Sequence, residues 1–308
     1  MRPKALLPAV LVALTAARVS AQTIDDSVMM RKNSLCTGLV YSHDRWESYW
    51  EGPLKRVNGN IGKITTQSVA GMLNYGVTDR LNVIATLPYV WTEASQGVLH
   101  GVSGWQDLTV AAKFNILETE FTRSGSLRTI IAVAAGTPIG DYTPDFQPLS
   151  LGNAAKTVSG RFTLNFQSNP GYFLNGSTGY TWRSDVTLDR PYYYTDGQLF
   201  LTNEVEMPEV FDYVVSAGYL KHGLNTEFSF RQQRMQAGGD IRRQDMPFVS
   251  NRMNLSQVGA MVLYPVPKLR RMEAKFAFAY TVDGRNVGQG TTLMTALQYR
   301  FSLFKGSK

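Results

Sequence analysis

The sequence is poor in the residues that build most catalytic and metal sites. Among 308 residues it has one cysteine, Cys36, and three histidines. A lone cysteine cannot close an intramolecular disulfide, and we interpret Cys36 as a small apolar residue of a strand. The histidines, His43, His100 and His222, share no metal-ligand spacing. The composition therefore predicts no metal, no cofactor and no enzymatic activity.

A hydrolase that combines a serine, a histidine and an acid is kept as an alternative, because these residue types are present. His43 lies toward the end of the first expected strand, His100 lies in a glycine-rich loop, and His222 lies in a turn. No sequence around them marks an activated nucleophile. A hydrolase is thus the least favoured of the functions considered.

Long apolar runs are also missing beyond the N-terminus. No later stretch reaches about 18 consecutive apolar residues, so we expect no transmembrane helix in the mature chain. Residues 1–21 have a basic start, an apolar run and the small-residue end Val19-Ser20-Ala21. This order is typical of a secretory signal peptide, and we expect cleavage after Ala21. The apolar run is shorter than the roughly 20 residues that a membrane-spanning helix needs.

The charge balance carries little information about partners. Removing Arg2, Lys4 and Arg18 with the signal leaves 28 of 31 basic residues against 24 acidic residues, and the formal charge falls from +7 to +4. Nucleic-acid binding requires basic residues clustered on one patch or helix, and here they are scattered among acidic residues. We therefore exclude nucleic acid as a partner.

The mature chain shows a sustained alternation of apolar and polar residues. In residues 108–116 one face holds only apolar side chains, whereas the other face carries Lys113 and Asn115. The apolar members are Leu108, Val110, Ala112, Phe114 and Ile116. The same pattern recurs in residues 81–91, 158–167, 172–183, 224–231, 272–281 and 293–303. Alternation with period two predicts strands that bury one face in an apolar environment.

Strand length separates a membrane barrel from a soluble sandwich. The alternating segments run about 9 to 13 residues, the length that a tilted strand needs to cross a bilayer. Soluble strands average about five or six residues. A sheet with an apolar outer face must close on itself in lipid. We therefore predict an all-β, antiparallel transmembrane β-barrel of about twelve strands, with fourteen as the alternative because residues 196–234 are ambiguous.

Connections and aromatic residues fit this prediction. Tight turns are expected at 76–79, 168–170 and 265–268, and long outer loops at 92–104, 137–156, 184–196 and 235–251. Aromatic residues near strand ends are expected to form the interfacial girdle. They are Trp46, Trp50, Tyr75, Tyr89, Trp91, Trp105, Tyr172, Trp182 and Tyr264.

Several motifs resemble a known family. They are Tyr75-Gly76-Val77-Thr78-Asp79-Arg80-Leu81-Asn82-Val83 with Leu87-Pro88-Tyr89, Gly104-Trp105-Gln106-Asp107-Leu108, Gly136-Thr137-Pro138-Ile139-Gly140-Asp141 and Gly284-Arg285-Asn286-Val287-Gly288. They resemble the outer-membrane transporters of the phenol meta-degradation pathway, which are distantly similar to long-chain fatty-acid transporters. The resemblance implies a twelve-stranded barrel that passes small hydrophobic or aromatic compounds, and it carries over no ligand residues.

Alternation also predicts which charged side chains line the lumen. They are Lys113, Arg128, Arg161, Arg183, Glu227, Arg231, Glu273, Lys275 and Arg300. Pairing across neighbouring strands accounts for the two acids, because buried charges are tolerated when they are paired or wet. The other basic groups have no evident inward acid. We expect them to line a hydrated path that favours anionic or electron-rich solutes such as aromatic carboxylates.

These observations predict the organisation of the chain and its partners. Residues 1–21 are the signal peptide, 22–34 an N-terminal periplasmic segment, 35–304 the outer-membrane barrel and 305–308 a C-terminal tail. The expected partners are outer-membrane lipids, lipopolysaccharide, the barrel assembly machinery and a small hydrophobic or aromatic solute. A channel or transporter is the first hypothesis. A structural or surface-binding barrel without transport is the second.

Overall fold

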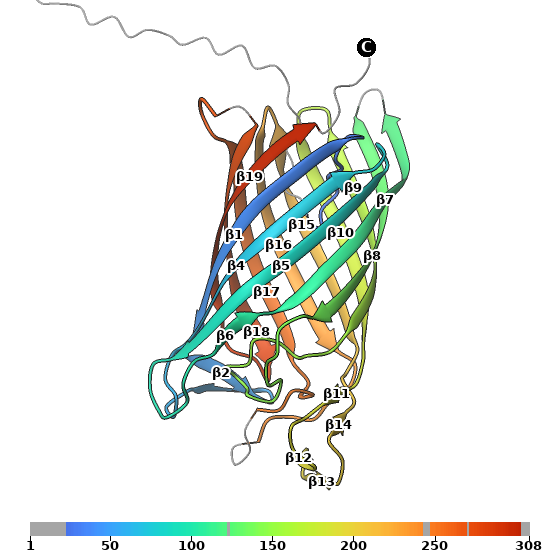
Figure 1. Cartoon of the computed structure of the whole chain (residues 1–308). Coiled ribbons are helices and arrows are strands. Elements are labelled where there is room, and N and C mark those ends of the chain that lie inside the picture. Colours follow the sequence, from blue (N-terminus) through green and yellow to red (C-terminus); the bar gives the residue numbers. More distant parts are fainter. Residues whose placement is uncertain (1–22, 122–123, 243–246, 270, 303–308) are drawn as a thin grey trace, which may run out of the picture.

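Twelve long antiparallel strands form a closed barrel in the computed structural model, which describes residues 23–121, 124–242, 247–269 and 271–302 (Figure 1). The prediction of a twelve-stranded barrel is confirmed. Each strand has 12 to 15 residues, as expected for tilted strands that cross a bilayer. The barrel strands are β1 (Ser34–Trp46), β4 (Ile64–Gly76), β5 (Leu81–Ala94), β7 (Asp107–Phe121), β8 (Gly125–Pro138), β9 (Thr157–Ser168), β10 (Tyr172–Arg183), β15 (Val210–Lys221), β16 (Leu224–Met235), β17 (Asn254–Pro265), β18 (Met272–Arg285) and β19 (Thr291–Ser302).

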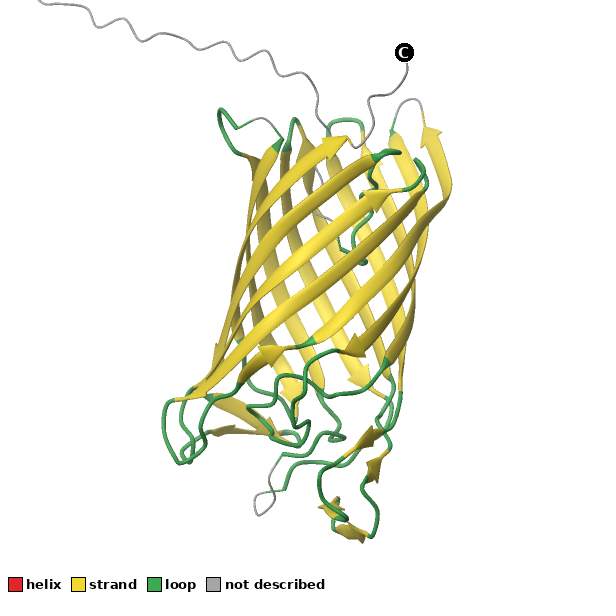
Figure 2. Ribbon diagram, viewed as in Figure 1, coloured by secondary structure: helices red, strands yellow, loops and turns green. Residues whose placement is uncertain are grey.

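The first and last strands close the ring. β1 pairs with β4 on one side and with β19 on the other, and the β1–β19 ladder runs from the Ser34↔Ser302 pair to the Arg45↔Thr291 pair. The other barrel strands pair with their neighbours in chain order, so the ring has no free strand edge. Closure satisfies the backbone hydrogen-bonding groups that lipid cannot satisfy. Figure 2 shows the strands tilted in one direction around the barrel.

The two faces of each strand differ in the way the alternation predicts. On β7, Val110 and Phe114 are exposed on the outer surface, whereas Ala111, Lys113 and Asn115 on the opposite face are buried. The outer surface therefore presents apolar side chains to the acyl chains. The inner surface carries the polar side chains, as in other transmembrane barrels.

The two ends of the barrel have different connections. We call the upper end in Figure 1 the turn end, because short turns join most strand pairs there. One of these turns consists of His222 and Gly223, which have φ angles of 54° and 87° and join β15 to β16. Two positive φ angles suit a two-residue turn between twisted strands. The short turns are expected to face the periplasm.

The opposite end, which we call the loop end, carries longer segments with small sheets of their own. These are β2 (Ser48–Glu51) with β3 (Leu54–Val57), β11 (Val186–Thr187) with β14 (Glu204–Val205), and β12 (Tyr193–Thr195) with β13 (Gln198–Phe200). β6 (Ser103–Trp105) extends the barrel wall beside β5. Residues 196–234 were ambiguous in sequence because residues 198–200 form a loop hairpin and not a barrel strand.

The loop end also has a small hydrophobic core of its own. Tyr193 stacks on Phe200 and on Phe248, with ring centroids 4.9 and 5.1 Å apart. Val205 and Met207 are buried beside them. Because these residues come from two separate connections, the loop segments stabilise one another at this end.

One expectation for the aromatic girdle is wrong. Trp50 is buried on β2 at the loop end, where it packs near Gly284, and is not on the lipid-facing surface. Other aromatic residues of the expected girdle, such as Trp105, Tyr172 and Tyr264, are exposed near strand ends. Amphipathic rings at these positions suit the headgroup region of a bilayer.

The lipid-facing assignment can be tested at Val133, which is 57% exposed on β8 between Ala112 and Gly160. Replacing Val133 with arginine puts a charge into the acyl region and should cost about 2 to 4 kcal/mol of unfolding free energy near the bilayer midplane. Val98→Arg is the matched control, because Val98 is 86% exposed in a loop. Denaturant titration in lipid vesicles should show little change for the control, and equal losses would contradict the assignment.

Candidate functional site

The N-terminal segment, residues 23–33, lies inside the barrel (Figure 2). It bonds to Lys113 on β7, to Arg161 on β9, to Asn175 on β10 and to Arg231 on β16. β7 and β16 are separated by four strands in the ring. A short segment can reach both only from the interior. The lumen is therefore occupied by the chain's own N-terminal segment.

Lys113 binds this segment with all three of its donors. Its Nζ lies 2.7 Å from Asp26 Oδ1, 2.9 Å from Thr23 O and 3.2 Å from Val28 O. The Lys113 side chain is fully buried, and Ala111 on the same face of β7 belongs to a buried apolar cluster against which Ile24 packs. An ammonium group buried in this way needs such partners, because an unpaired buried charge is costly.

Two arginines from different strands bind the carboxylate of Asp25. Arg161 Nε lies 3.1 Å from Asp25 Oδ1, and Arg231 donates to Asp25 Oδ2. The same arginines bind Asp212 on β15, since Arg161 Nη2 lies 2.7 Å from both of its carboxylate oxygens and Arg231 Nη1 lies 3.6 Å from Oδ2. Two carboxylates and two guanidinium groups thus form one network across the lumen.

The segment is also fixed where it joins the barrel. Asn33 N donates to Gly76 O at 2.8 Å, and Lys32 N donates to Asp79 Oδ1 at 3.0 Å. A Cβ atom on Gly76 would lie 2.1 Å from Arg31 O, so a larger residue at this turn would displace the segment. The turn motif around Gly76 and Asp79, which carries the family resemblance, therefore also binds the N-terminal segment.

Six buried asparagines surround the segment, and we call them the asparagine belt: Asn74, Asn82, Asn115, Asn165, Asn175 and Asn225. They come from β4, β5, β7, β9, β10 and β16. The side-chain oxygens of Asn165 and Asn225 have no hydrogen-bond partner among the described residues. Neutral groups with open acceptor positions can bind water or a polar solute.

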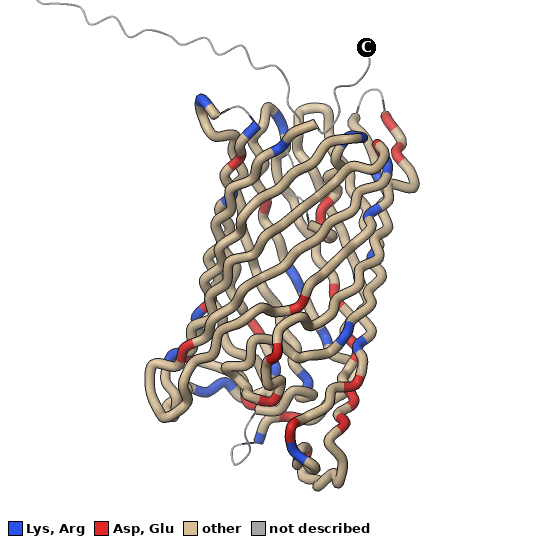
Figure 3. Tube along the Cα trace, in the orientation of Figure 1, with Lys and Arg blue, Asp and Glu red and all other residues tan. Residues whose placement is uncertain are grey.

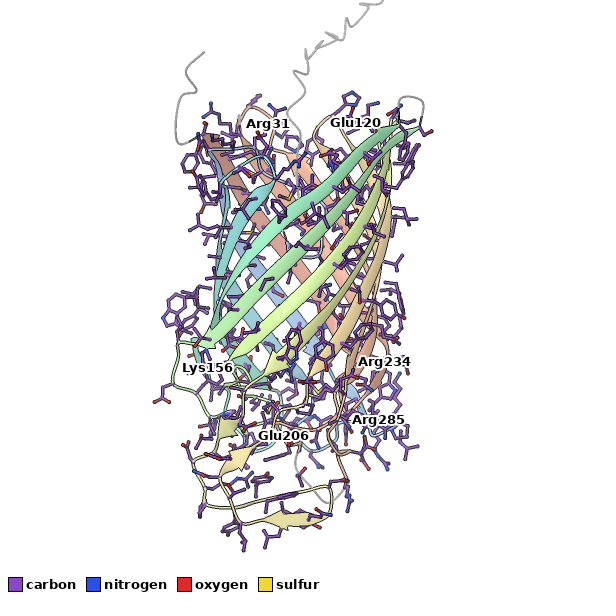
Figure 4. All side chains as sticks on the ribbon, turned by 90° about the vertical axis from the view of Figure 1, so that its right-hand side faces the viewer. Arg31, Glu120, Lys156, Glu206, Arg234 and Arg285 are labelled. Atoms are coloured by element: carbon purple, nitrogen blue, oxygen red, sulfur yellow. The ribbon has the colours of Figure 1, made fainter. Side chains whose placement is uncertain are left out.

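A cavity of ≈950 Å³ opens beside the segment at the turn end. Its lining includes Val28 and Arg31 of the segment, and Glu118, Arg128 and His222 from three parts of the ring. Figure 4 shows Arg31 and Glu120 at this end, and Lys156, Arg234 and Arg285 toward the opposite end. The lumen is therefore open toward the turn end up to the level of the segment.

A polar cluster fixes the connections at the loop end. Arg285 Nε donates to Asp240 Oδ1 at 2.7 Å, and Asn286 Nδ2 donates to the same oxygen at 2.8 Å. The hydrogen bond from Arg285 holds the pKa of Asp240 below its usual range. Asn286 Oδ1 also accepts from Gly52 N and Ile241 N. This cluster links three segments of the loop end.

The other charged residues that we expected in the lumen lie at several levels. Arg128 pairs with Glu118 at 2.7 Å, and Arg300 pairs with Glu273 at 2.8 Å. Glu227 lines a small cavity beside Asp26 and Ser27. Lys275 lies on β18. Arg183 lies at the end of β10, and its Nη1 has no hydrogen-bond partner in the described part of the chain.

The expectation that the remaining basic groups lack acidic partners is wrong for four of them. Asp25 and Asp26 of the N-terminal segment, Asp212 on β15 and Glu118 on β7 supply these partners. Asp212 could have been found from the sequence, because it occupies an inward position of an alternating strand. No sequence signal placed Asp25 and Asp26 in the lumen. Figure 3 shows other acidic and basic residues gathered at both ends of the barrel.

Other kinds of site find no support in the described residues. No group of three or more histidine, cysteine, aspartate or glutamate side chains is arranged to hold a metal ion there. In the same part of the chain, no helix is long and apolar enough to cross a membrane.

A closed, tilted ring of twelve strands with an apolar outer face and a polar lumen defines an outer-membrane β-barrel. The fold is similar to that of the COG4313 outer membrane channel from Pseudomonas putida F1, with a TM-score of 0.70 and 15% sequence identity. The match covers 92% of this chain and 100% of the other. Residues 57–297 match the family model described as "Putative MetA-pathway of phenol degradation", and the chain belongs to this family.

Two further solved barrels are less similar. The translocator domain of the autotransporter NalP from Neisseria meningitidis has a TM-score of 0.45 at 9% identity, covering 88% of this chain and 89% of that chain. A mutant of the monoaromatic hydrocarbon channel TodX has a TM-score of 0.44 at 9% identity, covering 89% and 91%. No curated protein sequence matches the chain.

Asp212 is the wall residue whose loss should affect the network most. Asp212→Asn leaves the buried guanidinium group of Arg161 and the half-buried one of Arg231 with less countercharge and should lower the unfolding free energy by about 3 kcal/mol. Asp196→Asn is the control, because Asp196 is 61% exposed and its pairing with Arg242 should be worth about 1 kcal/mol or less. Denaturant titration of both variants in lipid vesicles tests this, and equal effects would contradict a structural role for the network.

Proposed function

We propose that the protein is an outer-membrane channel or transporter for small hydrophobic or aromatic compounds, including aromatic carboxylates. The observation that carries this proposal is the polar lumen, which at mid-height is filled by a separate segment and not by side chains of the wall. A twelve-stranded barrel is wider than the eight-stranded barrels that wall side chains can fill. Its interior can therefore hold a path for solutes when the segment moves.

Membership of the phenol-degradation family supports the class of solute. The family description refers to the breakdown of an aromatic compound, and outer-membrane entry is a step that such breakdown needs. We further propose export through the signal peptide, insertion by the barrel assembly machinery, and contact with lipopolysaccharide at the loop end.

A structural barrel without transport is the second candidate. The occupied lumen favours it, because the segment bonds to strands on several sides at mid-height. The two candidates differ in whether the segment moves. A hydrolase has no comparable support among the described residues.

Solute flux through the reconstituted protein tests the proposal. The mature protein and a variant lacking residues 23–33 are placed in liposomes, and swelling rates are measured with benzoate and with arabinose. We expect the deletion variant to pass both solutes, because the wall alone leaves an open polar lumen. The intact protein should pass benzoate faster than arabinose.

The Asp196→Asn variant is the control for handling and insertion, and it should behave like the unaltered protein. Heat-modifiable migration on gels checks that each variant forms a barrel. If the folded deletion variant passes neither solute, the protein is a structural barrel and the proposed transport is wrong.

A further inference from the structure

We propose that Arg161 and Arg231 form a carboxylate-binding site for anionic solutes, and that Asp25 occupies this site as a displaceable internal ligand. This inference rests on the proposed transport function. It adds that the protein recognises the carboxylate group of the solute and that displacement of Asp25 opens the lumen.

The two arginines are held by the wall and not only by the segment. Arg161 Nη1 donates to Ser177 Oγ on β10 at 3.1 Å, and Arg161 Nη2 binds both oxygens of Asp212. Asp212 also contacts Arg231. The guanidinium groups therefore keep their positions when Asp25 leaves, so the site is preorganised for another carboxylate.

Asp25 shows how a solute carboxylate would bind. One oxygen contacts Arg161 and the other contacts Arg231, so the group bridges two strands of the ring. Guanidinium groups recognise carboxylates through paired, charge-assisted hydrogen bonds. Lys113 adds a third cation beside this pair through its contact with Asp26.

The net charge of the site becomes positive when the segment leaves. With the segment in place, Lys113, Arg161 and Arg231 face the carboxylates of Asp25, Asp26 and Asp212. Without it, Asp212 is the one carboxylate among the described wall residues that forms an ion pair with any of these three cations, although Glu227 lies nearby. The vacated site is therefore cationic and attracts anions.

The space left by Ile24 suits an apolar group attached to the carboxylate. Ile24 packs against Ile84, Ala111 and Ala134 on three neighbouring strands. Ala111 lies two residues before Lys113, on the same face of β7. Displacement thus uncovers an apolar patch next to the cations, which fits an aromatic or short aliphatic carboxylate better than a sugar or an inorganic anion.

Water can replace the wall groups that bind the N-terminal segment. Residues 23–31 form no helix or strand, and they are held by hydrogen bonds and ion pairs of Asp25 and Asp26, by the packing of Ile24 and by the burial of Met30. Water can bind to the side chains of the asparagine belt when the segment leaves, and the ≈950 Å³ cavity gives the segment room toward the turn end. Displacement therefore requires no strand to leave the barrel.

Thiol labelling reports the position of the segment directly. Ser27→Cys is introduced together with Cys36→Ser, so that the only thiol is one that is buried beside Asp26 in this structure. The protein in liposomes is labelled with a charged thiol reagent, with and without benzoate. Benzyl alcohol, which has the same ring and no charge, is the control solute.

We expect benzoate to raise the labelling rate about fivefold or more, a usual size for coupling between two binding events, and benzyl alcohol to have little effect. Adding Arg161→Gln and Arg231→Gln should raise the basal rate and remove the response to benzoate. Arg234→Gln is the matched control on the same strand, because Arg234 is exposed at the loop end, and it should keep the response (Figure 4).

Equal effects of benzoate and benzyl alcohol, or no effect of either, would overturn the inference. Flux through the variant lacking residues 23–33 separates this failure from that of the proposed function. If that variant conducts while labelling of the intact barrel ignores benzoate, transport stands and the carboxylate site is wrong. If that variant does not conduct, the transport function itself fails.

Discussion

Lipid offers no hydrogen-bond partners, so every backbone amide and carbonyl group in the membrane must find its partner within the protein. This constraint determines the rest of this structure. It forces the twelve strands to close through the β1–β19 ladder, because an open edge would leave a row of unsatisfied groups. Closure gives the sheet an outer face toward lipid and an inner face toward the lumen, and each side chain of a strand points to one of them. The apolar residues of each strand then face lipid, and the charges at mid-height of the strands must be neutralised or hydrated inside the lumen.

The N-terminal segment solves part of that electrostatic problem. Lys113, Arg161 and Arg231 lie in the wall with a single wall carboxylate, Asp212, among the ion pairs that the structure records for them. Three cations with one countercharge repel one another in a medium less polar than water. The carboxylates of Asp25 and Asp26 restore the balance without being part of the wall. The charge balance of this network therefore depends on a segment that precedes β1 and is not part of the wall.

The barrel could be predicted from the sequence because its signal is local. A strand such as β7 carries its face pattern within nine consecutive residues, and that pattern survives whatever its neighbours are. The β15–β16 boundary was harder, because the turn is only His222 and Gly223 and the nearby run 198–200 is apolar enough to imitate a strand. A two-residue turn with one glycine is hard to recognise in a sequence when apolar and polar residues alternate on both sides of it.

The contents of the lumen could not be predicted in the same way. Asp25 and Arg231 are 206 residues apart, and Asp26 and Lys113 are 87 residues apart. Contacts over such separations leave no periodic trace in the sequence. The sequence predicts residues 22–34 only as an N-terminal periplasmic segment that precedes the first strand. The structure places residues 23–33 against the inner wall. Asp212 differs from Asp25 and Asp26, because the alternation of inward and outward residues along β15 alone indicates that it points inward.

An internal ligand has a consequence for how tightly a solute can bind. Asp25 is tethered to the barrel, so its effective concentration at the two arginines is high and a free carboxylate must compete with it. The apparent affinity of the solute is lowered by the fraction of barrels in which the site is vacant. Passage through a channel needs binding that is strong enough for entry and weak enough for release. In the transport that we propose, a site built from two preorganised arginines would hold a carboxylate too long on its own, and the returning Asp25 carboxylate is the group that would displace it.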